Sequence, residues 1–549
     1  MDDAGQPPET PATPELPDRG SHRAPGRGVK RRSVLGAGAA ALGIAGLGIG
    51  AAEYEGSGSG TGNDGKQPVA ASETHRATAG ASPTPTPEED LPGDPNWQIS
   101  SVGEPDAIVG YADQVSVLPG QQVGLYVSTT SLSYQVMAFR VGWYGGAQAR
   151  LVWQSETLPG SAQADPQFEE TTRTISTQWN KSLTLDTTGW TEGAYLIRLD
   201  AANGHQRYVP LIVRSTGAKG KVLIMHATAT WQAYNLWGNY NLYQGADGAY
   251  STRSYVVTFD RPYDDNGAEK FLVYEQAAVV LAEKLGLPLA YTTGMDVHND
   301  PGVLTGATAL FSLGHDEYWT PQQRQYVTAA RDAGTNIAFL GANTCFRRVR
   351  FDSTTLGANR TVMCYKTDYQ LDPLYGSDDT LVTTDFRADP APDPESSMTG
   401  VLYESYPTDA PYVVTSADHW LFEGTGVQNG DSFDHLVGTE YDRVTPGYSF
   451  PRPLEIVAHS PLVCNGTDSH SDSAYYTVAS GAGVFASGTM RWVEGLLAGT
   501  PLGGDEDGMD ATTGAFVTQV TTNLMQAFAK GPAGTHMPAP QDNVDAIYD

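Results

Sequence analysis

The stretch that decides the fold of the larger part of the chain is ALFSLGHDEYWTPQQRQYVTAARDAGTNIAFLGAN, residues 309–343. It begins with an apolar run that predicts a buried strand at 309–314 and ends with a second such run at 336–343. Between them, Thr320 is a suitable N-cap, Pro321 a suitable first helical residue and Gly334 a suitable stop, which together predict a helix over 321–333. Strand, helix and strand in this order predict a parallel sheet covered by helices.

The same alternation continues on both sides of this stretch. Apolar runs predict strands at 221–225, at LPLAYTT (287–293) and at 483–488, and amphipathic patterns predict helices at 267–285 and in TTNLMQAFAK (521–530). The sequence therefore predicts a doubly wound α/β domain over 219–531, with a flavodoxin-like or glutamine-amidotransferase-like architecture.

Residues 97–215 follow a different pattern, with short alternating apolar runs separated by turn residues. About seven such runs predict antiparallel strands and an immunoglobulin-like β-sandwich, so the fold class is multidomain, β followed by α/β. Within this part, RVGWYGG (140–146) has two interpretations. It is an aromatic platform for a ligand, or it packs its tryptophan into the core at a strand end.

The N-terminus indicates the compartment. Lys30, Arg31 and Arg32 precede a Gly- and Ala-rich apolar run, which is typical of a twin-arginine signal within residues 1–52. We expect export to the cell envelope or the extracellular space, and no stable membrane span after cleavage. The alternative is an uncleaved anchor, because the run is about as long as a bilayer-spanning helix. Residues 53–95 are rich in Gly, Ser, Thr and Pro and predict a disordered linker, and residues 532–549 predict a disordered tail.

Charge and cysteine content exclude several classes of protein. The net charge of −30 argues against a nucleic-acid partner, because phosphate binding needs clustered Lys and Arg. We expect a homo-oligomer as the assembly. Three cysteines are too few for a disulfide scaffold. Cys345 and Cys364 are spaced to form one disulfide in an oxidising compartment, leaving Cys464 unpaired, and a free Cys345 is the alternative.

Polar and aromatic side chains follow the predicted strands where they end. Because parallel strands end at one edge of a sheet, these side chains should share a rim and line a pocket. The candidate pocket residues are His226, Trp231, Asn235, Trp237, Trp319, Asn343 and Arg491.

The turns at this rim lack two kinds of motif, and this excludes two classes of reaction. No Cys or Ser occupies the turn at 314–318, as a nucleophile elbow requires, and no phosphate-binding glycine motif is present in the sequence. Metal chemistry with oxygen ligands, or acid–base work, remains. The candidates are His315, Asp316, Glu317 and Glu440. The alternative for His315 is a structural hydrogen bond to Glu440.

Five phrases carry a resemblance over about residues 97–530: RVGWYGG, WQAYNLWG with NLY, GHDEYW, FLGANTCFRRVRF and VFASGTMRW. Together they resemble the large (beta) subunits of the N,N-dimethylformamidase family. The resemblance implies a β-sandwich joined to an amidotransferase-like domain that has lost its cysteine. It also implies hydrolysis of a small dialkyl amide at one iron, held by two tyrosines and a glutamate.

Carried onto this chain, the resemblance suggests Tyr318 as the first tyrosine and Glu440 as the glutamate. The second tyrosine is expected in the loop after the 336–343 strand, where Phe346 stands, and Tyr365 is the candidate substitute. The predicted function is metal-assisted hydrolysis of C–N bonds in a small linear amide, with His315, Asp316 and Glu317 as catalytic residues. The alternative is a non-catalytic carbohydrate- or cell-envelope-binding protein that keeps the fold.

Overall fold

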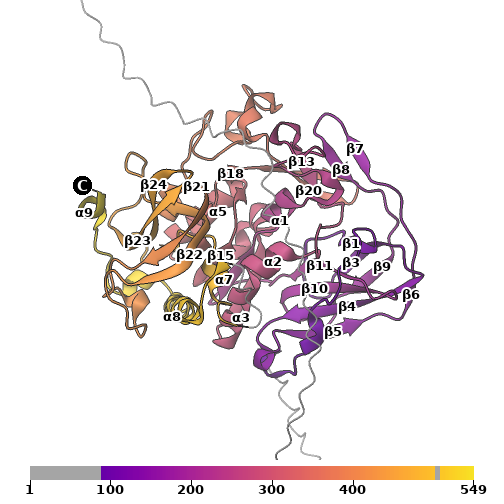
Figure 1. Ribbon diagram of the computed structural model, residues 1–549, viewed down its shortest axis with the longest axis horizontal. Coiled ribbons are helices and arrows are strands. Elements are labelled where there is room, and N and C mark those ends of the chain that lie inside the picture. The colour runs from indigo at the N-terminus through magenta and orange to yellow at the C-terminus, as the bar shows by residue number, and fades with distance from the viewer. Residues whose placement is uncertain (1–87, 501–506, 549) are drawn as a thin grey trace, which may run out of the picture. The chain divides into compact units, whose positions relative to one another are not determined.

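The computed structural model of the chain describes residues 88–500 and 507–548 (Figure 1). The twin-arginine segment and most of the predicted linker lie outside the described residues. The end of that linker is folded, because the Glu88 carboxylate accepts hydrogen bonds from Tyr144 Oη at 2.7 Å and from Arg150 Nε at 2.8 Å. No helix among the described residues is both long and apolar enough to cross a membrane.

Two sheets face each other in the first folded part (Figure 1). The smaller has the order β1 (Ile108–Ala112), β3 (Gln122–Thr129), β9 (Leu183–Asp186). The larger has the order β2 (Ser116–Val117), β11 (Gln206–Val213), β10 (Gly193–Ala201), β4 (Ser133–Val141), β5 (Ala149–Gln154), and β6 (Leu158–Pro159) pairs with β4. A hairpin of β7 (Gln167–Glu169) and β8 (Thr174–Ser176) lies beside them. Side chains from both sheets share one apolar core.

The larger sheet also connects this sandwich to the rest of the chain. In β10, Tyr195 and Ile197 belong to the core between the sheets, whereas Leu196 belongs to a second core shared with helix α3 (Gln276–Lys284). This follows from the alternation of side chains along a strand. Across the same boundary, Arg140 of β4 forms an ion pair with Glu283 of α3, with Nη2 and Oε1 2.6 Å apart. The RVGWYGG segment therefore packs at this boundary.

A seven-stranded sheet forms the centre of the second part. Its order is β14 (Leu289–Thr293), β12 (Val222–His226), β15 (Ala309–Gly314), β17 (Asn336–Gly341), β25 (Gly483–Ala486), β24 (Thr467–Thr477), β23 (Leu454–Cys464). The first five strands are parallel, and β24 and β23 are antiparallel additions. In chain order the five parallel strands stand second, first, third, fourth and fifth. The winding therefore reverses between β12 and β15, which is where ligands bind in such sheets.

Helices cover both faces of this sheet (Figure 1). One face packs against α3, α7 (Trp492–Gly495) and α8 (Ala511–Phe528), and the other against α4 (Gly294–Asn299), α5 (Pro321–Asp332), α6 (Ser396–Thr399) and α9 (Val544–Tyr548). In β15, Phe311 and Leu313 face the first group and Leu310 faces the second. A strand buried on both sides is uniformly apolar, which is why the 309–314 run predicts it correctly.

Smaller sheets and short helices complete the fold. The sheets are β13 (Val256–Thr258) with β20 (Gly357–Met363) and β19 (Arg350–Thr354), β16 (Tyr318–Trp319) with β18 (Arg347–Arg348), and β21 (Leu402–Val413) with β22 (Ser432–Arg443). The remaining helices are α1 (Thr228–Tyr234), α2 (Glu269–Tyr274) and the 3-10 turns η1 (Glu88–Asp90), η2 (Pro95–Trp97), η3 (Tyr144–Gly146), η4 (Trp237–Asn239), η5 (Tyr250–Thr252), η6 (Pro301–Leu304), η7 (Lys366–Leu371), η8 (Asp379–Leu381), η9 (Trp420–Phe422) and η11 (Ala533–Thr535).

Two expectations from the sequence differ from the structure. The helix expected at 267–285 is broken at Glu275 into α2 and α3, because the buried Glu275 carboxylate turns inward to His226 Nδ1 (2.5 Å) and Trp231 Nε1 (2.7 Å). The tail after residue 531 is folded up to Tyr548 instead of disordered. Val544 is buried in the sheet core, and Gln541 N donates to Glu455 Oε2 at 2.8 Å.

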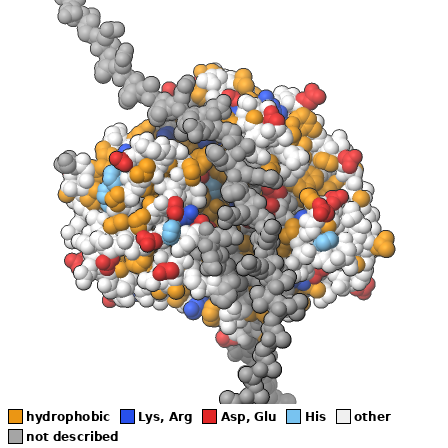
Figure 2. Space-filling view, in the orientation of Figure 1, with side chains coloured by type: hydrophobic (Ala, Val, Ile, Leu, Met, Phe, Trp, Pro, Cys, Tyr) orange, Lys and Arg blue, Asp and Glu red, His pale blue; other side chains and the backbone are white. Residues whose placement is uncertain are grey.

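Charged side chains are spread singly over the surface that Figure 2 shows. On the face that Figure 2 shows, acidic side chains are scattered between apolar and neutral ones, and Lys and Arg do not gather into a patch. This is in line with the net charge of −30.

Candidate active site

The candidate site forms where β15 and β17 end side by side. The two strands approach so closely that a Cβ on Gly341 would lie 1.6 Å from the Gly314 carbonyl oxygen, so only glycine fits at residue 341. Beyond Gly314, the chain continues through His315, Asp316 and Glu317 into β16, and beyond Gly341 it reaches Asn343. These turns place residues 315–317 next to the C-terminal end of α1 (Thr228–Tyr234).

Glu317 is the centre of the site. Its fully buried carboxylate accepts hydrogen bonds from Tyr234 Oη (2.7 Å), Tyr243 Oη (2.7 Å) and Arg347 Nε (3.1 Å), and His315 Nε2 lies 3.3 Å away. Burial alone raises the pKa of Glu317, but the His315 hydrogen bond and the Arg347 charge outweigh it and lower the pKa to about 2. Glu317 is therefore a carboxylate.

The two tyrosines come from α1 and the loop after it. Their hydroxyl oxygens lie 2.8 Å apart and their rings stack with centroids 4.5 Å apart. Burial, followed by the charge of Glu317, raises the pKa of both phenols well above the ordinary value. Thr230 fixes α1 against the strand end, since its hydroxyl accepts a hydrogen bond from Glu317 N at 3.0 Å. Two phenol oxygens and one carboxylate thus converge.

Glu440 of β22 lies on the other side of His315, with its Oε2 3.8 Å from His315 Nε2. Burial raises the pKa of Glu440 to about 7, and Glu317 adds to the rise while His315 opposes it. Asn343 Nδ2 donates to the same oxygen at 2.7 Å, and Asn343 N donates to Asp442 at 2.7 Å. Asn343 has a φ of 58°, and its side-chain oxygen is buried without a hydrogen-bond partner. It is a strained residue with a free acceptor, as functional sites often have.

Asp316 does not join this cluster. Its carboxyl accepts a hydrogen bond from Ser312 Oγ at 2.8 Å, and burial raises its pKa to about 7. Its carbonyl oxygen accepts hydrogen bonds from Cys345 N and Trp319 Nε1, both at 2.9 Å. Asp316 therefore holds the two turns together and is a positioning residue.

Tyr318 and Lys366 lie beside the cluster. The Tyr318 hydroxyl and the Lys366 ammonium nitrogen are both buried without a hydrogen-bond partner. Lys366 Nζ lies 3.1 Å from the centroid of the Tyr243 ring and 5.4 Å from that of Tyr318. Burial lowers the pKa of Lys366 well below its ordinary value.

The other two residues expected near the metal are placed elsewhere. Phe346 packs on Tyr403 with ring centroids 5.0 Å apart and lies between the guanidinium groups of Arg347 and Arg387. Tyr365 stacks on Tyr255, with centroids 4.7 Å apart. Among the described residues, the Tyr365 hydroxyl forms no hydrogen bond with Glu317 or Glu440, and Phe346 has no oxygen that could bind a metal.

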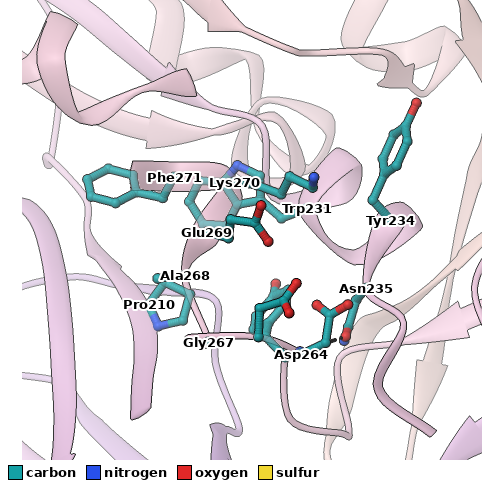
Figure 3. A pocket seen from close by; sticks show the side chains of 12 residues that line it. Pro210, Trp231, Tyr234, Asn235, Asp264, Gly267, Ala268, Glu269, Lys270 and Phe271 are labelled. Carbon is teal, nitrogen blue, oxygen red and sulfur yellow. Dashed lines mark hydrogen bonds between the residues drawn. The ribbon is translucent and has the colours of Figure 1, made fainter. Parts of the chain in front are cut away.

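The expected pocket residues divide into three groups. Trp231 and Asn235 line a surface pocket with Tyr234 (Figure 3). Asn343 lies in the site beside Glu440. The other four are used structurally. His226 contacts Glu275, Trp237 packs edge-on against Trp179, Trp319 is fully buried, and Arg491 pairs with Asp409 at 2.6 Å.

The predicted disulfide is absent. All three cysteines of the sequence lie in the described part of the chain and are free and buried. Cys345 Sγ accepts a hydrogen bond from Arg324 Nη1 at 3.4 Å, whereas Cys364 belongs to a different apolar cluster. Burial raises the pKa of Cys345 to about 12 and that of Cys364 to about 11, so neither is a thiolate nucleophile.

Four residues of the site are missing from the sequence-based candidates: Tyr234, Tyr243, Arg347 and Lys366. The two tyrosines could be predicted from the sequence, because they lie in the WQAYNLWG and NLY phrases that carry the family resemblance. The rule that ligands follow strand ends selects Trp231 and Asn235 from the same segment, but it does not distinguish Tyr234 or Tyr243 from their neighbours.

The donor set fits the iron that the resemblance implies, although at different residues. Two tyrosines and one glutamate bring hard oxygen donors together, and ferric iron prefers such donors. The described residues contain no group of three or more His, Cys, Asp or Glu side chains arranged to hold a metal ion, and a set with two tyrosines is not such a group.

Comparison with known proteins identifies the family. The family model described as N,N-dimethylformamidase beta subunit-like, C-terminal, matches residues 135–506, and the chain belongs to this family. No match was found among curated proteins. One similar solved structure is a cycloisomaltooligosaccharide glucanotransferase from Paenibacillus sp. in complex with cycloisomaltoheptaose, with 10% identity and a TM-score of 0.14. The match covers 47% of this chain and 34% of that one, and a likeness this slight carries no argument.

Proposed function

We propose that the chain hydrolyses the C–N bond of a small amide at the cluster around Glu317. The observation that carries this proposal is the convergence of the Tyr234 and Tyr243 hydroxyls on the Glu317 carboxylate, within 2.7–2.8 Å. Family membership supports it, because the family is named after an amide hydrolase. In this proposal Tyr234, Tyr243 and Glu317 hold iron, instead of Tyr318 and Glu440. Bound iron would polarise the amide carbonyl and acidify a water molecule.

The remaining residues supply proton handling and orientation. His315 Nε2 lies between Glu317 and Glu440, so it is placed to take a proton from a nucleophilic water. Glu440, with a pKa of about 7, can hold a proton at neutral pH and give it to the leaving amine. Asn343 fixes the Glu440 carboxyl, and Arg347 balances the charge of Glu317. Burial of all these groups excludes bulk water from the reacting centre.

The proposed iron ligands are tested by measuring the metal content and the visible absorption of the protein. Protein purified after export in its native host should contain iron near one equivalent and absorb in the visible range through tyrosinate-to-iron charge transfer. Tyr234→Phe and Tyr243→Phe should each lose most of the iron and the absorption band. Tyr326→Phe is the matched control and should keep both, because the Tyr326 hydroxyl accepts a hydrogen bond from Gln322 far along α5 from the site.

A protein without iron and without amidase activity would support the alternative function. A colourless wild-type protein that takes up no ferrous or ferric iron, together with no amide hydrolysis, would favour a non-catalytic carbohydrate- or cell-envelope-binding protein. Iron that is retained in both tyrosine variants would refute the ligand assignment, even if the protein is an amidase.

We propose in addition that the chain is exported by the twin-arginine route, on the strength of Arg31, Arg32 and the apolar run that follows. Residues 1–60 fused to a folded reporter should be exported, and replacing both arginines by lysine should abolish export. We also infer an immunoglobulin-like sandwich and a flavodoxin- or amidotransferase-like second domain. The two facing sheets and the strand order 2-1-3-4-5 support this inference.

A further inference from the structure

The candidate site is more accessible at Glu440 than at Glu317. The Glu317 side chain is 1% exposed and the His315 side chain 5%, whereas the Glu440 side chain is 12% exposed. A molecule that enters the cluster from outside therefore meets Glu440 first. The residues that stand beside Glu440 on its exposed side control what can enter.

A β-bulge in β21 stands beside Glu440. The register of β21 against β22 shifts between Ser405 and Thr408. As a result, Tyr406 and Pro407 of β21 together stand opposite the single residue Glu440 of β22. Bulges of this kind re-aim a side chain and are frequent next to active sites.

The Tyr406 side chain lies on the same face of this ladder as the Glu440 carboxyl. Paired residues share a face, and the two faces alternate along a strand. Ser405 pairs with Tyr441, the neighbour of Glu440, so both point away from the site. The next residue, Tyr406, therefore returns to the Glu440 face. In agreement, burial followed by the charges of Glu440 and Glu317 raises the pKa of the Tyr406 phenol.

The backbone of the bulge is held in place, whereas the Tyr406 side chain is not. Asn465 Nδ2 donates to the Tyr406 carbonyl oxygen at 2.9 Å, and Cys464 Sγ donates to the Pro407 carbonyl oxygen at 3.5 Å. Tyr406 is 48% exposed, and among the described residues no group hydrogen-bonds to its hydroxyl or stacks on its ring. The ring can therefore change rotamer while the strand stays in place.

We propose that Tyr406 is a specificity-determining residue, whose ring covers the Glu440 side of the site and limits the size of the group admitted beside Glu440. The identity of that group rests on the proposed function. There Glu440 gives a proton to the leaving amine, so the substituents on the amide nitrogen lie against the Tyr406 ring. Small substituents fit beneath the ring, whereas bulky ones require the ring to leave.

The size limit is measured at Glu440 itself, without amide hydrolysis and without iron. Carbodiimides react with protonated carboxyl groups, and Glu440 is protonated at pH 5.5 because its pKa is about 7. Mass-spectrometric peptide mapping of the exported chain gives the labelling rate of Glu440 by diisopropylcarbodiimide, which is small, and by dicyclohexylcarbodiimide, which is bulky. The exposed Glu156 of the sandwich, in the same sample, corrects for the intrinsic reactivity of the two reagents.

We expect the wild-type chain to favour the small reagent at Glu440 by about tenfold or more after this correction. Tyr406→Ala should reduce the preference to less than about threefold, and Tyr406→Phe, which keeps the ring, should retain it. Tyr375→Ala is the matched control, because it removes a tyrosine of similar exposure (46%) that does not stand opposite Glu440. It should also retain the preference.

The amine itself is tested with N-methylacetamide and N-benzylacetamide, which share an acyl group. Tyr406→Ala should raise kcat/KM for the benzyl amide relative to the methyl amide by about tenfold or more, and Tyr406→Phe should leave the ratio unchanged. An active Tyr406→Ala variant with an unchanged ratio would refute the assignment of the amine to Tyr406.

Equal labelling of wild-type Glu440 by the two reagents would overturn the proposal, and this comparison requires no variant to fold. An undiminished preference in Tyr406→Ala with a wild-type circular dichroism spectrum would overturn it too, as would the same loss of preference in Tyr375→Ala. A wild-type chain that hydrolyses neither amide, with or without iron, would refute the proposed function, whereas the labelling would still decide whether Tyr406 limits access to Glu440.

Discussion

Replacing Arg140 by methionine should destabilise the folded chain by about 3–5 kcal/mol, because it leaves a buried carboxylate without its counter-charge. Arg140 and Glu283 are 5% and 7% exposed, and two N–H groups of Arg140 reach Glu283 at 2.6 and 3.2 Å. Without the guanidinium group, the donors that Glu283 keeps among the described residues are Tyr291 Oη (2.7 Å) and Trp143 N (3.3 Å). Removing the charge as well, in Arg140→Met/Glu283→Leu, should restore part of the stability and leave about 1–3 kcal/mol of loss from unpaired hydroxyls.

Urea unfolding followed by both tryptophan fluorescence and far-ultraviolet circular dichroism measures the effect. The Arg140–Glu283 ion pair joins β4 of the sandwich to α3. In Arg140→Met, the fluorescence and the circular dichroism should therefore change in two distinct transitions. Free energies of unfolding are compared only for variants in which the two signals change together. Arg452→Met is the control, because the Arg452 pair with Asp545 is exposed and should be worth less than about 1 kcal/mol. A cost for Arg140→Met no larger than that of the control, or a double variant less stable than the single one, would refute the reasoning.

Three further predictions concern single residues. Burial lowers the pKa of His419 to about 3, so the native chain binds fewer protons than the unfolded chain below pH 6.5. The free energy of unfolding should therefore fall by roughly 3–5 kcal/mol between pH 6.5 and pH 3. In urea titrations at several pH values, His419→Gln should not show this decrease. Gly341→Ala should lower the free energy of unfolding by about 3 kcal/mol, and with it the thermal midpoint, because the added Cβ meets the Gly314 carbonyl; a midpoint equal to wild type would contradict the packing. Reductant should leave the thermal midpoint unchanged, since Cys345 and Cys364 are free, and a drop would indicate a disulfide.

The elements that the sequence predicts correctly are those whose signals are local. Thr320 accepts the hydrogen bond from Gln323 N at 3.1 Å that its position before Pro321 predicts, and α5 ends at Asp332, just before Gly334 at a φ of 112°. The uniformly apolar runs at 309–314 and 336–341 are strands because helices cover both of their faces. In these cases the residues concerned lie within a few positions of one another.

The errors have the opposite origin. The break at Glu275 depends on His226 and Trp231, which lie more than forty residues earlier, so the continuous amphipathic pattern of 267–285 could not reveal it. The folded end of the chain depends on Asn543, whose side-chain oxygen accepts from Ile456 N at 2.8 Å. Polar residues make such contacts without leaving an apolar pattern in the sequence.

The residues of the candidate site show the same difference between local and long-range signals. His315, Glu317, Asn343 and Glu440 are found together, and the first three follow from the rule that functional side chains stand at the ends of parallel strands. No residue pattern singles out Tyr234 and Tyr243, and the fold alone brings their hydroxyls to Glu317. The sequence therefore identifies the residues at the strand ends more readily than the tyrosines that meet them.

The hydrogen bonds of Glu317 also bear on how the site forms. A buried carboxylate without donors would destabilise the fold by several kcal/mol. Here two phenol hydroxyls and Arg347 satisfy it, so the protonated tyrosines provide what a metal would otherwise have to provide. The fold around Glu317 therefore does not depend on iron. If iron took the place of the two hydroxyl protons, as proposed, its affinity for the site would rise with pH.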